Sequence, residues 1–137
     1  MANYLLDCNH LSDAIRKVSP VRGRMQELHL TGAKFGTCIS VLCELAAGIQ
    51  QTANPDENYR RLRDILKYVR IWPIDLTTAK HYGQLYCDLR QLGRVLSHVD
   101  IVVAVIARQT KATVLTTDRD FDAVSDIAAE NWITPGA

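Results

Sequence analysis

Four acidic residues lie at the edges of apolar segments, where the backbone is expected to enter a core: Asp7, Glu44, Asp100 and Asp118. Asp7 and Asp118 directly follow strand-like segments, whereas Glu44 and Asp100 lie near the starts of expected helices. If these segments converge, two carboxylates about 4 Å apart repel by roughly 4 kcal/mol at an effective dielectric near 20. Such a cluster must be protonated, be paired with bases or bind a hard divalent cation. Ligands that are all oxygen atoms favour magnesium or manganese.

Three of these acids also have ordinary structural interpretations. Asp7 could close a turn with Asn9. Asp100 fits an S-x-x-D capping pattern that begins at Ser97, and Asp118 could cap the short helix that follows it. Separate capping roles at positions that all adjoin strand ends explain the pattern less simply than one shared site.

Glu44 is harder to assign to a purely structural role. It lies within the apolar segment 41–47, where a Glu is expected to be more enclosed than a surface helix acid usually is, although most helix acids are solvated. At 100° per residue, Glu44 lies about 120° from the centre of the apolar face of its helix. Its neighbours Ala47 and Gly48 are small, and they leave space for a cleft.

The elements that would position these acids alternate between short strands and helices. The pattern predicts strands at 4–6, 34–39, 71–74, 112–115 and 131–133, and helices at 9–18, 21–30, 40–50, 55–70, 77–92, 99–110 and 120–124. Ser40 is the expected cap of the third helix, and Asn54 precedes an early Pro and a first turn with acids in the fourth. Pro73 places its strand near a sheet edge. Short strands separated by helices predict one three-layer α/β/α domain over 1–137, with a parallel sheet whose carboxyl edge binds ligands.

Composition limits the classes of function. The chain has 137 residues and 47% hydrophobic content, and its 16 Lys and Arg against 15 Asp and Glu leave a net charge of +1, so any basic surface must be local. The four cysteines form no C-x-x-C pair, and the four histidines have no zinc spacing, so reduced and mostly buried thiols are expected. No apolar run approaches about 18 residues, which predicts a soluble, cytoplasmic protein without a membrane partner.

The segments around the four acids, in their order along the chain, resemble a PIN domain, and more closely the VapC-type toxins of bacterial toxin–antitoxin pairs. The resemblance covers nearly the whole chain and rests on five segments: Leu5–Asn9 (L-L-D-x-N), Glu44, Asp100–Ala104, Leu115–Asp118 with Phe121, and Asn131–Trp132. Cys8, Thr117 and the pair His98–Val99 depart from residues common in the family, but none of these departures removes a carboxylate. His98 could be an additional contact near the cleft or a solvated residue of the capping region.

The resemblance implies a metal-dependent endoribonuclease that hydrolyses RNA phosphodiester bonds and leaves 5′-phosphate and 3′-hydroxyl ends. Mg²⁺ or Mn²⁺ would be held by Asp7 and Asp100, with Glu44 and Asp118 directly or through water. Asn9 and Thr116 would orient the carboxylates. The implied substrate is transfer or ribosomal RNA, and the implied partners are a VapB-type antitoxin and a second copy of the chain.

Basic side chains crowd the expected fourth helix and offer a possible RNA contact: Arg60, Arg61, Arg63 and Lys67, with Arg70 beyond them. A solvated face is the alternative, because Asp56, Glu57 and Asp64 are interspersed as helix partners. The apolar positions of this helix and of the helix at 77–92 could form a dimer contact, although core packing explains many of the same residues: Tyr59, Leu62, Leu66, Tyr82, Leu85 and Leu89.

Other α/β enzymes fit less well. A haloacid-dehalogenase-like phosphatase needs a second Asp at position 9, which is Asn9 here, and a receiver domain needs paired acids after its first strand. The remaining rival is a catalytically inactive PIN scaffold that binds RNA or protein. Catalytic use of the acids predicts that magnesium or manganese raises the melting temperature, which separates the two hypotheses.

Overall fold

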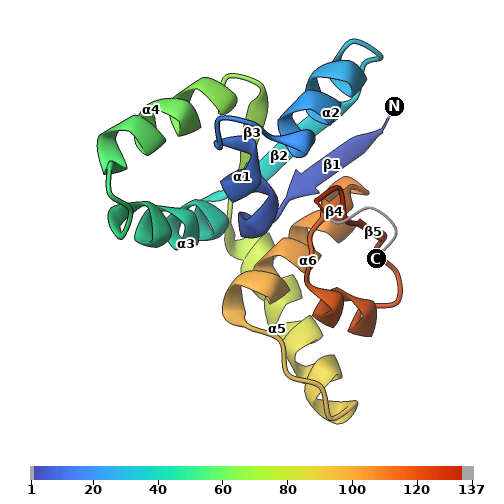
Figure 1. The fold of residues 1–137 in the computed structure, drawn as a ribbon. Helices are drawn as coiled ribbons and strands as arrows, with labels where there is room; N and C mark the ends of the chain where they lie inside the picture. The colour runs from blue at the N-terminus through green and yellow to red at the C-terminus, as the bar shows by residue number, and fades with distance from the viewer. Residues whose placement is uncertain (1, 134–137) are drawn as a thin grey trace.

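A parallel five-stranded sheet forms the centre of the protein (Figure 1). The computed structural model describes residues 2–133. The strand order is β3-β2-β1-β4-β5, and every neighbouring pair is parallel. The strands are β1 (Asn3–Leu6), β2 (Lys34–Cys38), β3 (Val69–Trp72), β4 (Thr113–Leu115) and β5 (Ala129–Glu130). Because β1 lies between β2 and β4, the carboxyl ends of the three central strands meet at one edge.

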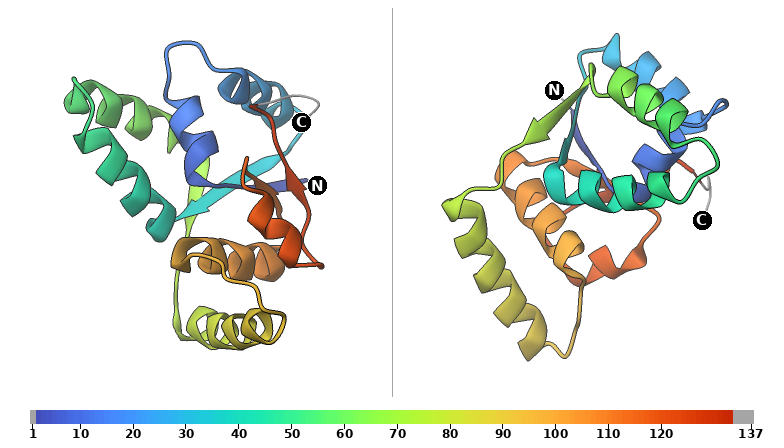
Figure 2. Two further views of the ribbon diagram at one scale, coloured as in Figure 1. Left: turned by 60° about the horizontal axis from the view of Figure 1, so that its bottom comes forward. Right: turned by 90° about the vertical axis from the view of Figure 1, so that its left-hand side faces the viewer.

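Helices cover both faces of this sheet. They are α1 (Cys8–Ala14), α2 (Pro20–His29), α3 (Ile39–Gln50), α4 (Pro55–Ile65), α5 (Leu76–Gln91) and α6 (His98–Thr110), followed by the 3₁₀ helix η1 (Arg119–Ala123). Figure 2 shows α6, with α5 outside it, on the side of the sheet opposite α1, α2 and α4. The predicted three-layer α/β/α arrangement is therefore confirmed. Helix α6 is buried over Ile101–Ala107, as its apolar sequence predicts.

The fourth helix and third strand differ from the sequence prediction in their bounds. Helix α4 ends at Ile65 and not near residue 70, because the buried Val69 pairs with Phe35 of β2 and draws the chain into the sheet. The apolar pattern continues through this junction, so helical periodicity alone could not locate the end. Strand β3 lies at the sheet edge, as predicted, and it ends at Trp72, just before Pro73.

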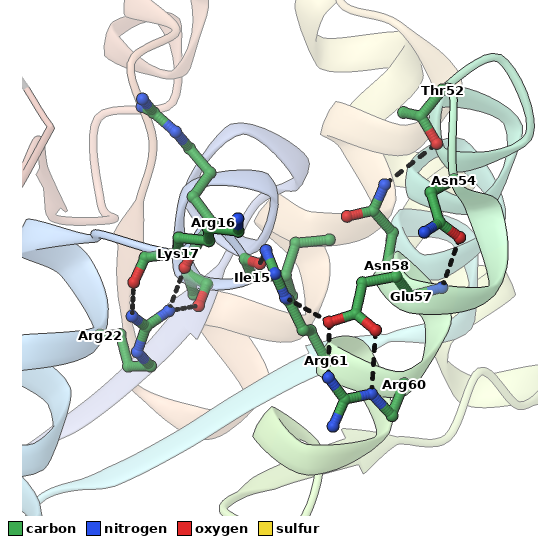
Figure 3. Close-up of polar contacts among 11 residues, drawn as sticks. Ile15, Arg16, Lys17, Arg22, Thr52, Asn54, Glu57, Asn58, Arg60 and Arg61 are labelled. Atoms are coloured by element: carbon green, nitrogen blue, oxygen red, sulfur yellow. Dashed lines mark hydrogen bonds and ion pairs between the residues drawn. The ribbon is translucent and has the colours of Figure 1, made fainter.

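The first helix is also shorter than predicted, ending at Ala14 and not at residue 18. The Arg22 guanidinium donates hydrogen bonds to the carbonyls of Ala14 (2.6 Å), Arg16 (2.5 Å) and Lys17 (2.8 Å), as Figure 3 shows for the last turn and the loop after it. The buried Asp13 accepts a hydrogen bond from Ser19 Oγ at 2.6 Å. These contacts fold the chain back into α2 before the helix can continue.

Three smaller predictions are wrong. Helix α3 begins at Ile39, and its cap position is Cys38 without a side-chain hydrogen bond, so Ser40 is not the cap. The last described strand is β5 at Ala129–Glu130, and residues 131–133 follow it. All four cysteines are free thiols, but only Cys38 is buried, and two of the others are exposed. No helix within residues 2–133 has the length and apolarity needed to cross a membrane.

Gly36 of β2 is needed because the indole of Trp72 lies against its backbone. A Cβ at position 36 would lie 2.7 Å from Trp72 Cδ1, and the Arg70 guanidinium covers the ring 3.8 Å from its centroid. We expect Gly36→Ala to lower the free energy of unfolding by about 1–3 kcal/mol, as overpacking does. Urea unfolding tests this. Gly83→Ala in α5, where nothing lies within 4 Å, is the matched control and should stabilise the helix by about 0.5–1 kcal/mol. Equal stability of Gly36→Ala and the native chain would contradict the packing argument.

Candidate metal centre

Two of the predicted acids follow neighbouring parallel strands. Asp7 comes directly after β1, and its backbone N–H donates to the carbonyl of Leu115 at 3.0 Å, which extends the pairing of β1 with β4. Asp118 follows the same strand β4 after Thr116 and Thr117. Asp7 and Asp118 therefore lie at one edge of the sheet, as expected from their positions after strands. Asp100 reaches this edge from the first turn of α6.

A tight carboxylate cluster forms where these elements meet. Oxygen atoms of Asp100, Asp118 and Asp120 all lie within 4.8 Å of one another. Asp7 adjoins them through Thr116, whose Oγ1 donates to Asp7 Oδ2 at 2.9 Å and accepts from the Asp118 backbone N–H at 3.0 Å. Three acids predicted from the sequence thus lie at one site, together with Asp120, which the sequence analysis missed.

The pKa values of the cluster show that its charges are costly without a cation. Burial, followed by the charges of Asp7 and Asp118, raises the pKa of Asp100 from 3.8 to about 7. Burial also raises the pKa of Asp7, while hydrogen bonds from the Cys8 N–H and the Thr116 hydroxyl oppose that shift. With a pKa of about 7, Asp100 is partly protonated at neutral pH when no cation is bound.

Glu44 differs from its prediction, because its side chain is exposed and not enclosed. Helix α3 buries Val41, Leu42, Leu45 and Ile49, and Glu44 is on another face of it. Glu44 lies outside the group of acids whose oxygen atoms approach within 4.8 Å, among the described residues. It still adjoins the centre. Burial, then the charges of Glu44 and Asp7, raises the pKa of the Cys8 thiol to about 12.

The ordinary capping roles considered for these acids are also present. Asp7 Oδ1 accepts from the Cys8 N–H at 2.8 Å, and Asp118 Oδ1 accepts from the Asp120 N–H at 2.8 Å. Ser97 Oγ accepts from the Asp100 N–H at 3.1 Å. Capping and clustering are therefore not alternatives here: the same hydrogen bonds that begin α1, η1 and α6 fix where the carboxylates lie. The D-x-D spacing of Asp118 and Asp120 was the available signal for the missed acid.

A chain of polar contacts behind the cluster contains a second residue missed by sequence reasoning, His10. Asn9 Nδ2 donates to Thr116 Oγ1 at 3.4 Å, and Asn9 Oδ1 accepts from the Thr117 N–H at 3.2 Å. His10 Nε2 accepts from the Trp132 N–H at 3.0 Å, so its Nδ1 carries the proton and donates to Asn9 Oδ1 at 2.7 Å. Burial lowers the pKa of His10 to about 4, which keeps the imidazole neutral in this role.

The basic residues of α4 lie on a helix that packs against α3 (Figure 1). Figure 3 shows Arg60 and Arg61 both directed at Glu57. The ion pairs measure 2.5 Å for Arg60 and 3.3 Å for Arg61. Lys67 pairs with Asp64 at 3.5 Å. These helix pairs match the solvated-face alternative, and the RNA contact of Arg60, Arg61, Arg63 and Lys67 stays a prediction. The dimer contact also stays a prediction. Leu62, Leu85 and Leu89 are buried within this chain, so core packing accounts for these three residues.

The donor set fits a hard divalent ion. Asp7, Asp100, Asp118 and Asp120 offer only oxygen atoms, and two of them have raised pKa values that a bound cation would reverse. Burial raises the pKa of the Cys8 thiol, which follows Asp7, to about 12, so deprotonating it to bind a softer metal is costly.

Magnesium binding is expected to tighten as pH rises from about 5.5 to 8. Asp100 has a pKa of about 7 and must lose its proton to act as a ligand. Calorimetry in two buffers with different ionisation enthalpies should show proton release on binding near pH 6, and less release at pH 8. Asp100→Asn should lose this release. An affinity independent of pH in the native chain would contradict the assignment.

The fold and the site together define the class of protein. It is a parallel α/β domain with a centre of carboxylate oxygen atoms at the carboxyl edge of its sheet. The family model of the PIN domain matches residues 4–127, and the chain therefore belongs to the PIN domain family.

Known proteins similar to this chain are VapC-type PIN proteins, which confirms the resemblance seen in the sequence. Ribonuclease VapC2 of Rickettsia felis is 26% identical over 130 residues, spanning 94% of this chain and 97% of that protein. The tRNA(fMet)-specific endonuclease VapC of Shigella flexneri is 28% identical over 136 residues, spanning 96% and 99%. The crystal structure of VapBC2 from R. felis, bound to a DNA fragment from its promoter, has a chain that aligns with a TM-score of 0.83 at 25% identity, covering 95% of this chain and 98% of that one.

Proposed function

We propose that this protein is a metal-dependent endoribonuclease that hydrolyses phosphodiester bonds in RNA, and that it is the toxin of a toxin–antitoxin pair. The carboxylate cluster of Asp100, Asp118 and Asp120, with oxygen atoms within 4.8 Å, carries the proposal. Similar proteins named as ribonucleases support it. An inactive scaffold is not favoured, because unused carboxylates held this close would only destabilise the fold.

Asp7, Asp100, Asp118 and Asp120 would hold Mg²⁺ or Mn²⁺, which when bound neutralises phosphate charge and lowers the pKa of water. Thr116 fixes the orientation of the Asp7 carboxylate through its 2.9 Å hydrogen bond. Asp100 gives up its proton when the centre is loaded. Glu44 is exposed beside Cys8, so its carboxylate is open to solvent and can accept a proton from a water molecule. No side chain needs to become a covalent nucleophile, and we expect cytoplasmic RNA to be the substrate.

The proposed antitoxin partner has a suitable groove at the C-terminal end of α1, whereas Asp7 precedes its first turn. A cavity of about 670 Å³ lies between the α1–α2 segment, β2 and α4, with Met25, Phe35 and Ile65 among its apolar lining residues. Four cations also line it, and Figure 3 labels them: Arg16, Lys17, Arg22 and Arg61. Arg16 pairs with Asp13 and Arg61 with Glu57. The lining acid Asp64 is paired with Lys67. We infer that an antitoxin segment with apolar and acidic side chains binds here, as the solved relatives include VapBC complexes.

The partner inference is tested by co-purification with a VapB-type antitoxin. Lys17→Glu reverses one of the charges that line the groove and should weaken the complex at least about tenfold at low salt. Lys80→Glu, on the exposed side of α5, is the matched charge reversal and should have no comparable effect. Equal retention of the antitoxin by both variants would exclude this groove.

The nuclease activity is tested by incubating total bacterial RNA with the protein and Mg²⁺ or Mn²⁺. Discrete fragments should form, and their ends should identify the RNA as transfer or ribosomal. Asp118→Asn and EDTA should abolish them, while Asp122→Asn, which neutralises an exposed acid of the 3₁₀ helix that Asp118 caps, should not. Fragments that persist in EDTA would contradict the metal requirement. Metal-dependent stabilisation without cleavage of any RNA would favour the scaffold.

A further inference from the structure

We propose that a stripe of rings and cations on α5 binds a single-stranded segment of the substrate RNA as it leaves the acidic centre. We call this stripe, with its two neighbours from the following loop and helix, the α5 platform: Tyr82, Tyr86, Arg90, Arg94 and His98. The inference rests on the proposed function, because it assigns the RNA a path away from the carboxylates.

The platform is an ordered ladder. Tyr82, Tyr86 and Arg90 are spaced four residues apart, so they lie along one side of the helix. The two tyrosine rings are stacked, with centroids 6.4 Å apart and an interplanar angle of 14°. The Arg90 guanidinium lies 5.7 Å from the Tyr86 ring centroid, and its Nη1 donates to the Tyr86 hydroxyl at 3.0 Å. The side chains are therefore arranged before any ligand binds.

One end of the ladder reaches the acidic centre. The His98 ring lies 5.1 Å from the ring of Tyr82, and its Nδ1 is 3.0 Å from the Tyr82 hydroxyl. His98 begins α6 two residues before Asp100, and α5 and α6 pack against each other (Figure 1). A strand whose phosphate is held at Asp100 would meet His98 and Tyr82 next.

Core packing does not explain the outer part of the platform. Helix α5 buries Leu85 and Leu89, whereas Tyr86 is 41% exposed and Arg90 is exposed. A hollow of about 470 Å³ adjoins the ladder and is lined by Tyr86, Arg90 and Arg94, among others. An exposed ring beside the Arg90 guanidinium, next to a hollow that Arg94 also lines, suits a base with its flanking phosphates.

The charges favour RNA over a second copy of the chain as the occupant. The α5 platform carries Arg90 and Arg94 and no acid of its own, so it attracts phosphate, whereas two platforms placed against each other would repel. The α5 acid Asp88 lies about 200° around the helix from Tyr86 and does not neutralise the stripe. Stacking on aromatic rings tolerates any base, so the platform would add affinity without requiring one sequence.

The test measures binding of fluorescent single-stranded RNA, about 12 nucleotides of oligouridylate or oligoadenylate, to the full chain carrying Asp100→Asn to suppress cleavage. Tyr86→Ala should weaken binding about 5- to 100-fold, and Tyr86→Phe, which keeps the ring, should restore it to within about twofold. Arg90→Ala should also lower the slope of log affinity against log salt by about one. Lys80→Ala removes one charge from the same helix about 120° away from Tyr86, and it should leave the salt slope unchanged. Melting curves check that each variant is folded.

Two further measurements separate this inference from the proposed function. Without Asp100→Asn, the ratio of RNA cleavage to hydrolysis of bis(p-nitrophenyl) phosphate, which is too short to reach Tyr86 from Asp100, should fall in Tyr86→Ala. If the native chain cleaves RNA but Tyr86→Ala leaves both the RNA affinity and this ratio unchanged, the platform is overturned and the nuclease stands. Weakened binding in Tyr86→Ala without any cleavage would support the platform and reject the nuclease. Light scattering that shows Tyr86→Ala converting a dimer to a monomer, with RNA affinity unchanged, would assign the stripe to self-association and overturn the inference.

Discussion

Asp100→Asn is expected to abolish RNA cleavage while making the metal-free protein more stable. The native carboxylate is half-buried beside Asp7 and Asp118, and these surroundings raise its pKa to about 7. Asparagine has nearly the same shape but no charge, so it removes the repulsion and also removes a ligand. We expect cleavage to fall by at least about 10³-fold, because a bound metal contributes several kcal/mol to charge stabilisation in such reactions.

The stabilising effect of Asp100→Asn should depend on pH in a defined direction. A carboxyl group with a raised pKa in the folded state binds its proton more tightly there, so ionisation lowers the stability of the native chain as pH rises from about 4 to 7. The variant should therefore melt at a higher temperature than the native chain at pH 8 and at a similar temperature near pH 4. Magnesium should raise the melting temperature of the native chain only. Asp88→Asn, at an exposed acid of α5, is the matched control. A variant that loses stability at pH 8, or keeps the response to magnesium, would contradict this account of the cluster.

The convergence of Asp7, Asp100 and Asp118 could be predicted because it follows from topology. Parallel strands end at one edge, and a helix that leaves this edge begins there, so residue spacing and apolar pattern were sufficient. For Asp120 the D-x-D spacing was the available signal. Its place depends on the 3₁₀ turn that Asp118 caps, and a short polar segment has no hydrophobic period that would reveal such a turn.

Glu44 shows where apolar sequence context misleads. Its neighbours Cys43 and Ala47 are apolar in type but exposed in the structure, because α3 uses only one side for the core. The angular position of Glu44, about 120° from that side, was the better guide to its exposure. The same limit applies to α4, where Leu66 and Val69 continue an apolar pattern although only one of them belongs to the sheet.

His10 could not be recognised from the sequence, since its partner lies 122 residues further along the chain. Its imidazole is fully buried and joins the Trp132 N–H to Asn9, which in turn contacts Thr116 behind Asp7. One side chain thus connects the end of the described chain to the orientation of a proposed metal ligand. Removal of the His10 side chain should therefore lower both the stability of the fold and the rate of catalysis.

His10→Ala is expected to lower the free energy of unfolding by about 2–4 kcal/mol, because it leaves a cavity and an unpaired Trp132 N–H. Urea unfolding at pH 7.5 measures this, and His81→Ala, at an exposed histidine of α5, should change it by less than about 0.5 kcal/mol. The pKa of His10 is lowered from 6.5 to about 4, so its protonation disfavours the native state as pH falls through this range, and the difference between the native chain and His10→Ala should shrink there.

The variant should also bind Mg²⁺ more weakly, by about 10- to 100-fold, because Asn9 no longer holds Thr116 against Asp7. A destabilised variant with unchanged magnesium affinity would show that the Asp7 carboxylate is positioned without this chain of contacts.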